Sequence, residues 1–345
     1  MWRLSNAILR ERSNPKAAAA ATATVASAGK ALTTKRFQHA LAVQLDYYMS
    51  PQFAGVASAL VNNTYASKGL TDISFLPICP VGLEMERVRI HQHSNPTSLS
   101  LGTAEQNIFV PTLKRNPQLK TTAIAAMFAK SPLCIASLPN NASENDFNPD
   151  IIGTHEDTVD IMRRIFPNHD VVASPRFTKT RDLIDGKVGA IQAYTTTEVP
   201  ALRMTLGSEP FVVEMEGCNG AKLGYSQVIF AADECLQDDR KEIANAFCEA
   251  TFQGWANVID NPKEAVELVK EAKKMLALDD EDNDHWVDND DFELEMIERC
   301  SDYVKGTFAG GKYGVIDQHR WREANEWLLN DDSNAELGFD DSVWK

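Results

Sequence analysis

A strand, helix and strand near the start of the apolar part of the chain most constrain the fold. Residues 41–45 and 73–78 are apolar runs of the length of buried central strands. Between them, Ser50 and Pro51 suit the start of a helix, and apolar residues then recur at helical spacing up to Leu60. This order predicts a right-handed crossover and a parallel sheet, and hence an α/β fold.

Further segments extend the same pattern. We expect strands at residues 98–101, 119–128 and 132–138, and a second, shorter strand-helix-strand run that ends at Ile191. A polar loop opens at Pro139 and runs to Pro149, which makes it a candidate crossing between two lobes. Two segments, 209–216 and 224–231, are typical of strands that lead the chain back from the second lobe to the first. From Asp238 the chain is predicted to be helical, and the acidic residues 279–291 are predicted to form a solvated linker.

Composition limits the class of partner. The 345 residues carry a formal net charge of -15, which disfavours nucleic acid, and no apolar run approaches the length of a membrane-spanning helix. Residues 1–36 are the exception, with seven Lys or Arg and one acidic residue among many Ala, Ser and Thr. This basic segment predicts an organelle transit peptide, mitochondrial rather than plastid. A basic tail without a targeting role is the alternative.

Metal binding is not expected. His91 and His93 alternate within a segment that we expect to form a loop, and no third ligand lies nearby in the sequence. The acidic residues 279–291 resemble a calcium loop only superficially, because His285 replaces the required glycine. The six cysteines are scattered without a CxxC pair and are expected to be small buried side chains.

The stretch VGAIQAYTTTEVP, residues 188–200, is a candidate ligand loop. A short buried strand runs into a polar turn, and Tyr194 and Glu198 lie four residues apart around that turn. Ligands of open α/β sheets bind outside the carboxyl ends of the strands. An aromatic ring and a carboxylate at this point suit a flat heteroaromatic ligand that donates hydrogen bonds. A packed tyrosine and a solvated glutamate remain the alternative.

A second candidate loop follows the predicted strand 98–101. Gly102 allows close approach of a ligand, and Thr103 and Gln106 match the Thr-x-x-Gln capping box of a helix start. The free N–H groups of a helix N-terminus favour an acceptor or an anion. A capped helix without a ligand explains the same residues.

Four segments carry a resemblance to a known family: LDYYMSPQFAGVASAL, SLGTAEQ, GAIQAYTTTEVPAL and YGVIDQHRW. Over about residues 40–329 the chain resembles thiamine-pyrimidine-binding proteins of the periplasmic-binding-protein type II superfamily, which are related to sulfonate-binding proteins and to eukaryotic pyrimidine synthases. The resemblance implies two α/β lobes with a ligand cleft between them that closes by hinge motion. Together with the basic composition of residues 1–36 and a tail from Asp331 that we expect to be frayed, it predicts a division of the chain into a transit peptide 1–36, lobe I 37–138, lobe II 139–225, a return strand and C-terminal helices 226–330, and a tail 331–345.

The resemblance also implies the ligand-binding residues. They are Asp46, Tyr47, Tyr48, Gly102, Thr103, Gln106, Tyr194 and Glu198. A tyrosine would stack on an aminopyrimidine, and Glu198 would accept from the exocyclic amine and the protonated ring nitrogen as a bidentate pair. Asp46 would bind a second edge of the ring, or would simply cap the first helix.

The related synthases resemble single-turnover enzymes that consume a histidine and use pyridoxal phosphate held by a lysine. Where their second loop has Lys and His four residues apart, this chain has Gly102 and Gln106, and their cysteine-rich run is reduced to Cys218. We expect no lysine near the site, since Lys114 lies further along the chain.

These departures disfavour an enzyme, and no catalytic residue, cofactor or metal is expected. The sequence therefore predicts a binding protein for a thiamine-precursor aminopyrimidine, acting in thiamine biosynthesis or salvage. A synthase with pyridoxal phosphate, a binding protein for another small anion such as a sulfonate, and an interaction-only protein with an occluded cleft are the alternatives.

Overall fold

The computed structural model describes residues 40–139, 149–175, 178–237, 239–276 and 289–344. All of them belong to one compact unit of the chain, residues 34–345. The predicted transit peptide 1–36, most of the polar loop after Pro139 and most of the acidic linker 279–291 lie outside the described residues.

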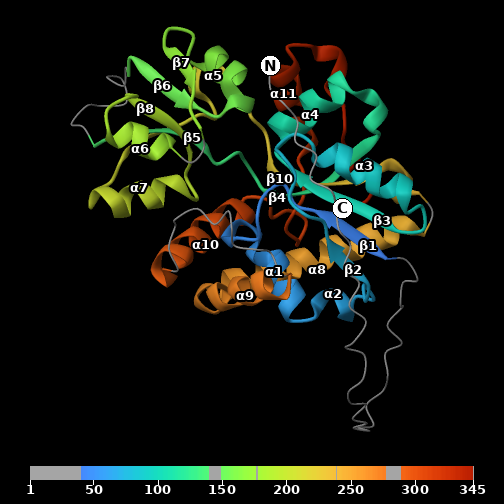
Figure 1. Cartoon of the computed structure of the whole chain (residues 1–345). Helices are drawn as coiled ribbons and strands as arrows, with labels where there is room; N and C mark the ends of the chain where they lie inside the picture. Colours follow the sequence, from blue (N-terminus) through green and yellow to red (C-terminus); the bar gives the residue numbers. More distant parts are fainter. Residues whose placement is uncertain (1–39, 140–148, 176–177, 238, 277–288, 345) are drawn as a thin grey trace, which may run out of the picture. The chain divides into compact units, whose positions relative to one another are not determined.

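Sheet A contains five strands in the order β2-β1-β3-β10-β4 (Figure 1). They are β1 (Leu41–Gln44), β2 (Ile73–Phe75), β3 (Leu99–Ala104), β4 (Thr121–Phe128) and β10 (Ser226–Ala232). β1 pairs in parallel with both β2 and β3, which confirms the parallel sheet predicted from the first strand-helix-strand run. β10 lies antiparallel between β3 and β4, so the chain returns to this sheet after the second one is complete.

The helices around sheet A come from both ends of the chain. They are η1 (Pro51–Phe53), α1 (Ala54–Val61), α2 (Thr64–Ser67), α3 (Glu84–Ser94), α4 (Gln106–Arg115), η2 (Pro117–Leu119), η6 (Asp233–Leu236), α8 (Arg240–Asp260), α9 (Pro262–Met275), α10 (Asp290–Lys305) and α11 (Gln318–Leu329). α3 is longer than predicted, because His91 and His93 continue the helix. α1 and α8 pack so closely that a Cβ on Gly254 would lie 2.0 Å from the Gly55 carbonyl oxygen, and only glycine fits there.

Sheet B has the order β7-β6-β8-β5-β9, with β5 antiparallel to β8 and β9 (Figure 1). Its strands are β5 (Leu133–Ser137), β6 (Ile151–Thr154), β7 (Asp170–Ala173), β8 (Ala190–Tyr194) and β9 (Phe211–Glu214). Its helices are η4 (Glu156–Thr158), α5 (Val159–Ile165), α6 (Lys179–Ile184), α7 (Glu198–Leu206) and η5 (Cys218–Gly220). Both faces are buried: Leu133 and Ile135 face one apolar cluster, and Cys134 and Ala136 face the other.

The structure shifts one predicted boundary. β5 pairs with sheet B, so the chain leaves sheet A between Phe128 and Leu133, before the point at which the sequence interpretation ends lobe I. The reason is physical: the run Leu-Cys-Ile-Ala-Ser is apolar on both faces and fits the centre of either sheet, so its pattern does not indicate its partner strands.

The C-terminal segment packs on sheet A. Phe339 forms a β-bridge with Ala123, and the Trp344 indole donates to the Tyr313 carbonyl oxygen at 2.8 Å. Trp344 is 6% exposed, so the prediction of a frayed tail is wrong, because its aromatic side chains pack against apolar residues.

All six cysteines are free, and five of them are buried. None of the described helices combines the length and the apolar composition that spanning a bilayer requires.

Candidate functional site

A cavity of about 430 Å³ lies where the carboxyl ends of strands from both sheets meet. Asp46 follows β1, Glu105 follows β3, His155 follows β6, and Tyr194 ends β8. Helices α9 and α10 complete the lining with Lys273, Phe292, Glu293 and Met296. The volume lies in the range of small-molecule sites, about 300–1,000 Å³.

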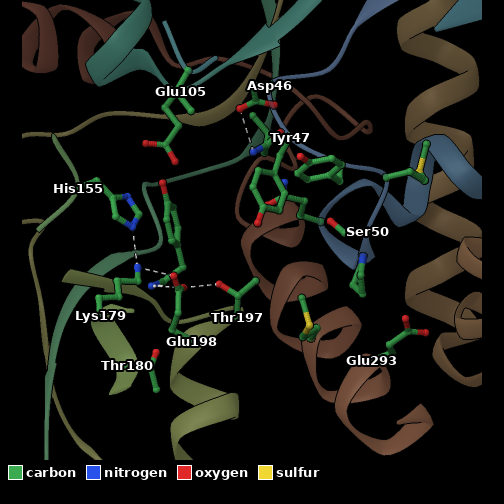
Figure 2. Close-up of a pocket in the computed structure, with 18 of the residues that line it drawn as sticks. Asp46, Tyr47, Ser50, Glu105, His155, Lys179, Thr180, Thr197, Glu198 and Glu293 are labelled. Atoms are coloured by element: carbon green, nitrogen blue, oxygen red, sulfur yellow. Dashed lines mark hydrogen bonds and ion pairs between the residues drawn. The ribbon is translucent and has the colours of Figure 1, made fainter. Parts of the chain in front are cut away.

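The sheet-B wall of the cavity, which we define as His155, Lys179, Thr197 and Glu198, is a closed network (Figure 2). Lys179 is 1% exposed. Its Nζ lies 2.5 Å from Glu198 Oε1, 2.7 Å from His155 Nε2 and 3.0 Å from the Gln192 carbonyl oxygen. An ammonium group has three protons, and each has an acceptor here. His155 Nε2 therefore accepts, which places the ring proton of neutral His155 on Nδ1.

Glu198 begins α7, and its two oxygens are already engaged. Oε1 pairs with Lys179, while Oε2 accepts from the Tyr194 backbone N–H at 3.0 Å and the Thr197 hydroxyl at 2.6 Å. Burial by itself would raise the pKa of Glu198, but the charge and hydrogen bond of Lys179 outweigh burial and hold this pKa well below its usual value.

The bidentate role predicted for Glu198 is therefore not compatible with this geometry. A carboxylate has about four acceptor positions, and three are occupied, so a ligand can add one hydrogen bond at Oε1.

The sheet-A wall, which we define as Asp46, Glu84, Glu105 and Gln227, contains three acidic side chains and one amide. Asp46 accepts from the Thr103 hydroxyl at 2.5 Å and from Gln227 Nε2 at 3.3 Å. Both oxygens of Glu84 accept from the Gly82 N–H, at 3.0 and 2.9 Å. Burial, followed by the charge of Asp46 and then that of Glu105, raises the pKa of Glu84 to about 8. The carboxylates of this wall therefore lie close enough to oppose one another's ionisation.

Five of the eight predicted site residues line the cavity: Asp46, Tyr47, Tyr48, Tyr194 and Glu198. The rings of Tyr47 and Tyr48 pack edge to face at 5.2 Å. Thr103 does not line the cavity, but its hydroxyl donates a hydrogen bond to the Asp46 carboxylate and fixes its position.

Gly102 and Gln106 do not line the cavity. A Cβ on Gly102 would meet the Phe230 ring at 2.4 Å, so this glycine serves strand packing. Gln106 is fully buried and bonds to Asn325 Oδ1 at 2.9 Å, the Trp321 carbonyl oxygen at 3.1 Å and the Tyr225 N–H at 3.0 Å.

The predicted capping box is wrong. Thr103 belongs to β3, Glu105 occupies the N-cap of α4, and Gln106 is the first helical residue. The strand continues three residues further than expected, because Gly102, Thr103 and Ala104 all pair with β10.

Among the lining residues that the sequence interpretation missed are Glu105, His155, Lys179 and Gln227. Glu105 and His155 directly follow strands, so the rule that selected Tyr194 could have found them. Lys179 and Gln227 come from the start of a short helix and from the return strand, and only the fold brings them to the cavity. The expectation that no lysine lies near the site is wrong.

The described residues do not fit pyridoxal phosphate. A Schiff base requires a free lysine amine, whereas all three protons of the Lys179 ammonium are engaged. The other basic side chains in the described lining, Arg181 and Lys273, pair with Asp185 and Glu293. The part of the chain that the structure describes also contains no group of three potential metal ligands.

Solved structures share this fold. The aliphatic sulphonate-binding protein SsuA of Escherichia coli aligns with a TM-score of 0.57 and 11% identity, covering 90% of this chain and 93% of its own. SsuA of Xanthomonas axonopodis pv. citri bound to MOPS gives 0.55 and 9% identity, with coverage of 88% and 95%. The nitrate-binding protein NrtA of Synechocystis gives 0.53 and 10% identity, with coverage of 89% and 87%. These likenesses confirm the predicted α/β fold of the periplasmic-binding-protein type.

Sequence comparisons point to one family. No curated protein matches the chain in sequence. The family model described as NMT1/THI5 like matches residues 91–265, which is just over half of the chain and includes β3, β10 and the sheet-B wall of the cavity. The suspected family is thereby confirmed, and the chain belongs to the NMT1/THI5-like family.

Proposed function

We propose that this protein binds a thiamine-precursor aminopyrimidine in the cavity and acts in thiamine biosynthesis or salvage. One observation carries the proposal: the described lining contains more acidic than basic side chains, and each of its two lysines pairs with a carboxylate. Such a lining favours a ligand that donates hydrogen bonds or carries positive charge.

The same observation disfavours an anionic ligand. Lys179 pairs with Glu198 at 2.5 Å, Lys273 with Glu293 at 3.2 Å, and Arg181 with Asp185 at 2.8 Å. A sulfonate deep in the cavity would have to break the buried Lys179–Glu198 pair or lie beside the acidic side chains of the sheet-A wall, and either choice is costly. The sulfonate- and nitrate-binding proteins named above share the fold with this chain, and a common fold does not transfer the ligand.

An aminopyrimidine suits the remaining lining. Tyr47, Tyr48 and Tyr194 supply aromatic faces, and stacking on one of them would contribute about 0.5–1.5 kcal/mol beyond area burial. The exocyclic amine and a protonated ring nitrogen would donate to carboxylate oxygens, as charge-assisted hydrogen bonds. The family and the sequence resemblance support the link to thiamine. We further propose a mitochondrial location, supported by the basic composition of residues 1–36.

Calorimetry and thermal unfolding of the full chain test the proposal. The ligands are 4-amino-5-hydroxymethyl-2-methylpyrimidine, its phosphate and an alkanesulfonate. We expect heat and a rise in melting temperature with at least one pyrimidine, and at least tenfold weaker binding in Glu105→Gln, which removes one charge from the sheet-A wall. Glu336→Gln, an exposed carboxylate outside the cavity, is the matched control and should bind as wild type. Absence of heat and of any thermal shift with both pyrimidines would end the proposal.

A further inference from the structure

The turn between β8 and α7 carries two of the lining residues and is short. Tyr194 ends β8, Glu198 begins α7, and only residues 195–197 connect them. The Tyr194 N–H donates to Glu198 Oε2 at 3.0 Å, and the Thr197 N–H donates to the Tyr194 carbonyl oxygen at 3.2 Å. Because these bonds hold the turn together, a displacement of Thr195 would also move Tyr194 and Glu198.

Thr195, the first residue of this turn, is bound by two side chains of α10. The Tyr303 hydroxyl lies 2.6 Å from Thr195 Oγ1, and Arg299 Nη1 donates to the Thr195 carbonyl oxygen at 3.2 Å. The bond from the guanidinium group is charge-assisted and therefore stronger than a neutral one. The Thr195 N–H donates to the Pro132 carbonyl oxygen at 2.9 Å, so sheet B holds one side of this residue and α10 holds the other.

α10 is itself anchored in the core of sheet A. Ile297, Cys300 and Val304 are fully buried in the apolar cluster that covers this sheet. Arg299 and Tyr303 are four residues apart on the same helix, which places them on one face, and they reach Thr195 from there. The turn that follows β8 of sheet B is thus connected to the core of sheet A.

The guanidinium group of Arg299 is oriented by Glu295. Arg299 Nε and Nη2 lie 3.0 and 2.9 Å from Glu295 Oε1, and Glu295 Oε2 pairs with Arg203 of α7. The two arginine side chains are 34% and 38% exposed, and ion pairs with this exposure contribute little to stability. These contacts are therefore better suited to fix the position of the turn than to stabilise the fold.

We propose that Arg299 and Tyr303 are positioning residues of the binding site, which fix the turn that carries Tyr194 and Glu198 so that these two side chains meet the ligand in a preset geometry. Neither Arg299 nor Tyr303 belongs to the described lining of the cavity. A preset geometry raises affinity because less conformational freedom is lost on binding. This inference rests on the proposed function where it concerns the pyrimidine, whereas the order of the turn is measurable in the ligand-free protein.

Hydrogen exchange of the ligand-free full chain, followed by mass spectrometry, tests the positioning itself. Arg299→Met removes the donor to the Thr195 carbonyl oxygen, and Tyr303→Phe removes a hydroxyl group but keeps the aromatic ring. We expect peptides that cover residues 190–198 to exchange at least about fivefold faster in both variants, because the turn opens more often. Peptides from β3 should exchange as in wild type.

The melting temperature separates positioning from stability. It should change by at most about 3 °C in either variant, since each substitution removes only partly exposed contacts. Lys305→Met is the matched control, because Lys305 lies on the same helix, pairs with Asp302 and is 51% exposed. It should leave both the exchange of residues 190–198 and the melting temperature as in wild type. A much larger loss of melting temperature in both Arg299→Met and Tyr303→Phe would assign these contacts to the stability of the fold and overturn the inference.

Calorimetry with the pyrimidine tests whether the position of the turn matters to the ligand. Both variants should bind at least about fivefold more weakly than wild type. In a Tyr194→Leu background, Arg299→Met should weaken binding by a smaller factor, because a residue that acts through Tyr194 has less to position once the aromatic ring is removed.

The outcomes distinguish this inference from the proposed function. If exchange rises in both variants but wild type binds neither pyrimidine, the proposed function fails and the positioning of the turn stands. If residues 190–198 exchange at the wild-type rate in both Arg299→Met and Tyr303→Phe, the inference is overturned. Wild-type affinity in both variants, or the same loss of affinity from Arg299→Met with and without the Tyr194 ring, overturns it as well.

Discussion

The two walls of the cavity solve the problem of buried charge in opposite ways. On the sheet-B wall, Lys179 satisfies Glu198 and His155, and the network closes on itself. On the sheet-A wall, burial and the charges of Asp46 and Glu105 raise the pKa of Glu84 to about 8, so this carboxyl group keeps its proton at neutral pH instead of pairing with an ammonium group. This difference in how charge is balanced leads us to infer that the sheet-B wall fixes the geometry of the site and that the sheet-A wall selects the ligand.

The largest expected effect comes from removing Lys179, the cation of the sheet-B wall. Lys179→Met leaves the Glu198 carboxylate buried beside an apolar side chain, and we expect a loss of about 3–5 kcal/mol of unfolding free energy. Denaturant titration measures the loss. The matched control is Lys187→Met, because Lys187 pairs with Asp182 at the surface and its side chain is 61% exposed. Its effect should stay below about 1 kcal/mol. Equal effects of the two substitutions would show that the network does not stabilise the fold.

A double-mutant cycle sharpens the same point. Glu198→Gln alone leaves Lys179 without its partner, and Lys179→Met alone leaves the Glu198 carboxylate without its partner. The double variant contains neither charge, so no buried charge is left unpaired. The double variant should therefore be more stable than the sum of the single losses implies, by about 1–3 kcal/mol. Strict additivity would contradict a direct interaction between these two side chains.

The sheet-A wall should make the stability of the folded protein depend on pH. The pKa of Glu84 is raised in the folded protein from its ordinary 4.5 to about 8, so the folded state holds the proton more tightly than the unfolded state. This contribution to stability is complete below about pH 4.5 and is lost as the pH rises through 8.

We expect the melting temperature of the ligand-free protein to fall by at least about 3 °C between pH 6 and pH 9, the change that roughly 2 kcal/mol produces in a domain of this size. Glu84→Gln should flatten this slope. A variant that keeps the slope of wild type would place the titrating group elsewhere.

The smallest expected effect concerns the aromatic lining. Tyr194→Leu keeps an apolar side chain in the cavity and leaves the backbone N–H that donates to Glu198. We expect the affinity for the pyrimidine to fall about 2- to 12-fold, as loss of one stacking contact implies. Calorimetry measures it, with the melting temperature of the free protein as the control for folding. Unchanged affinity would exclude Tyr194 as the stacking residue.

The sequence predicted the features that depend on local pattern. Parallel pairing of β1 with β2 and β3 follows from apolar runs around one amphipathic helix. Tyr194 was found because it lies at the end of a predicted strand, and Asp46 because of the family resemblance. The sequence could not predict which sheet accepts β5, since both faces of that strand are apolar. It could not predict that Lys179 would neutralise Glu198 either, because they lie on different helices and meet only in the folded protein.

The central claim is that the cavity selects donors over anions, and a calorimetric comparison on the full chain tests it most directly. The aminopyrimidine and an alkanesulfonate are titrated separately into the same protein at the same pH and ionic strength, and the ratio of the two dissociation constants is measured. The account predicts that the aminopyrimidine binds at least about 100-fold more tightly, a difference of roughly 2.7 kcal/mol. Equal affinities, or tighter binding of the sulfonate, would contradict it.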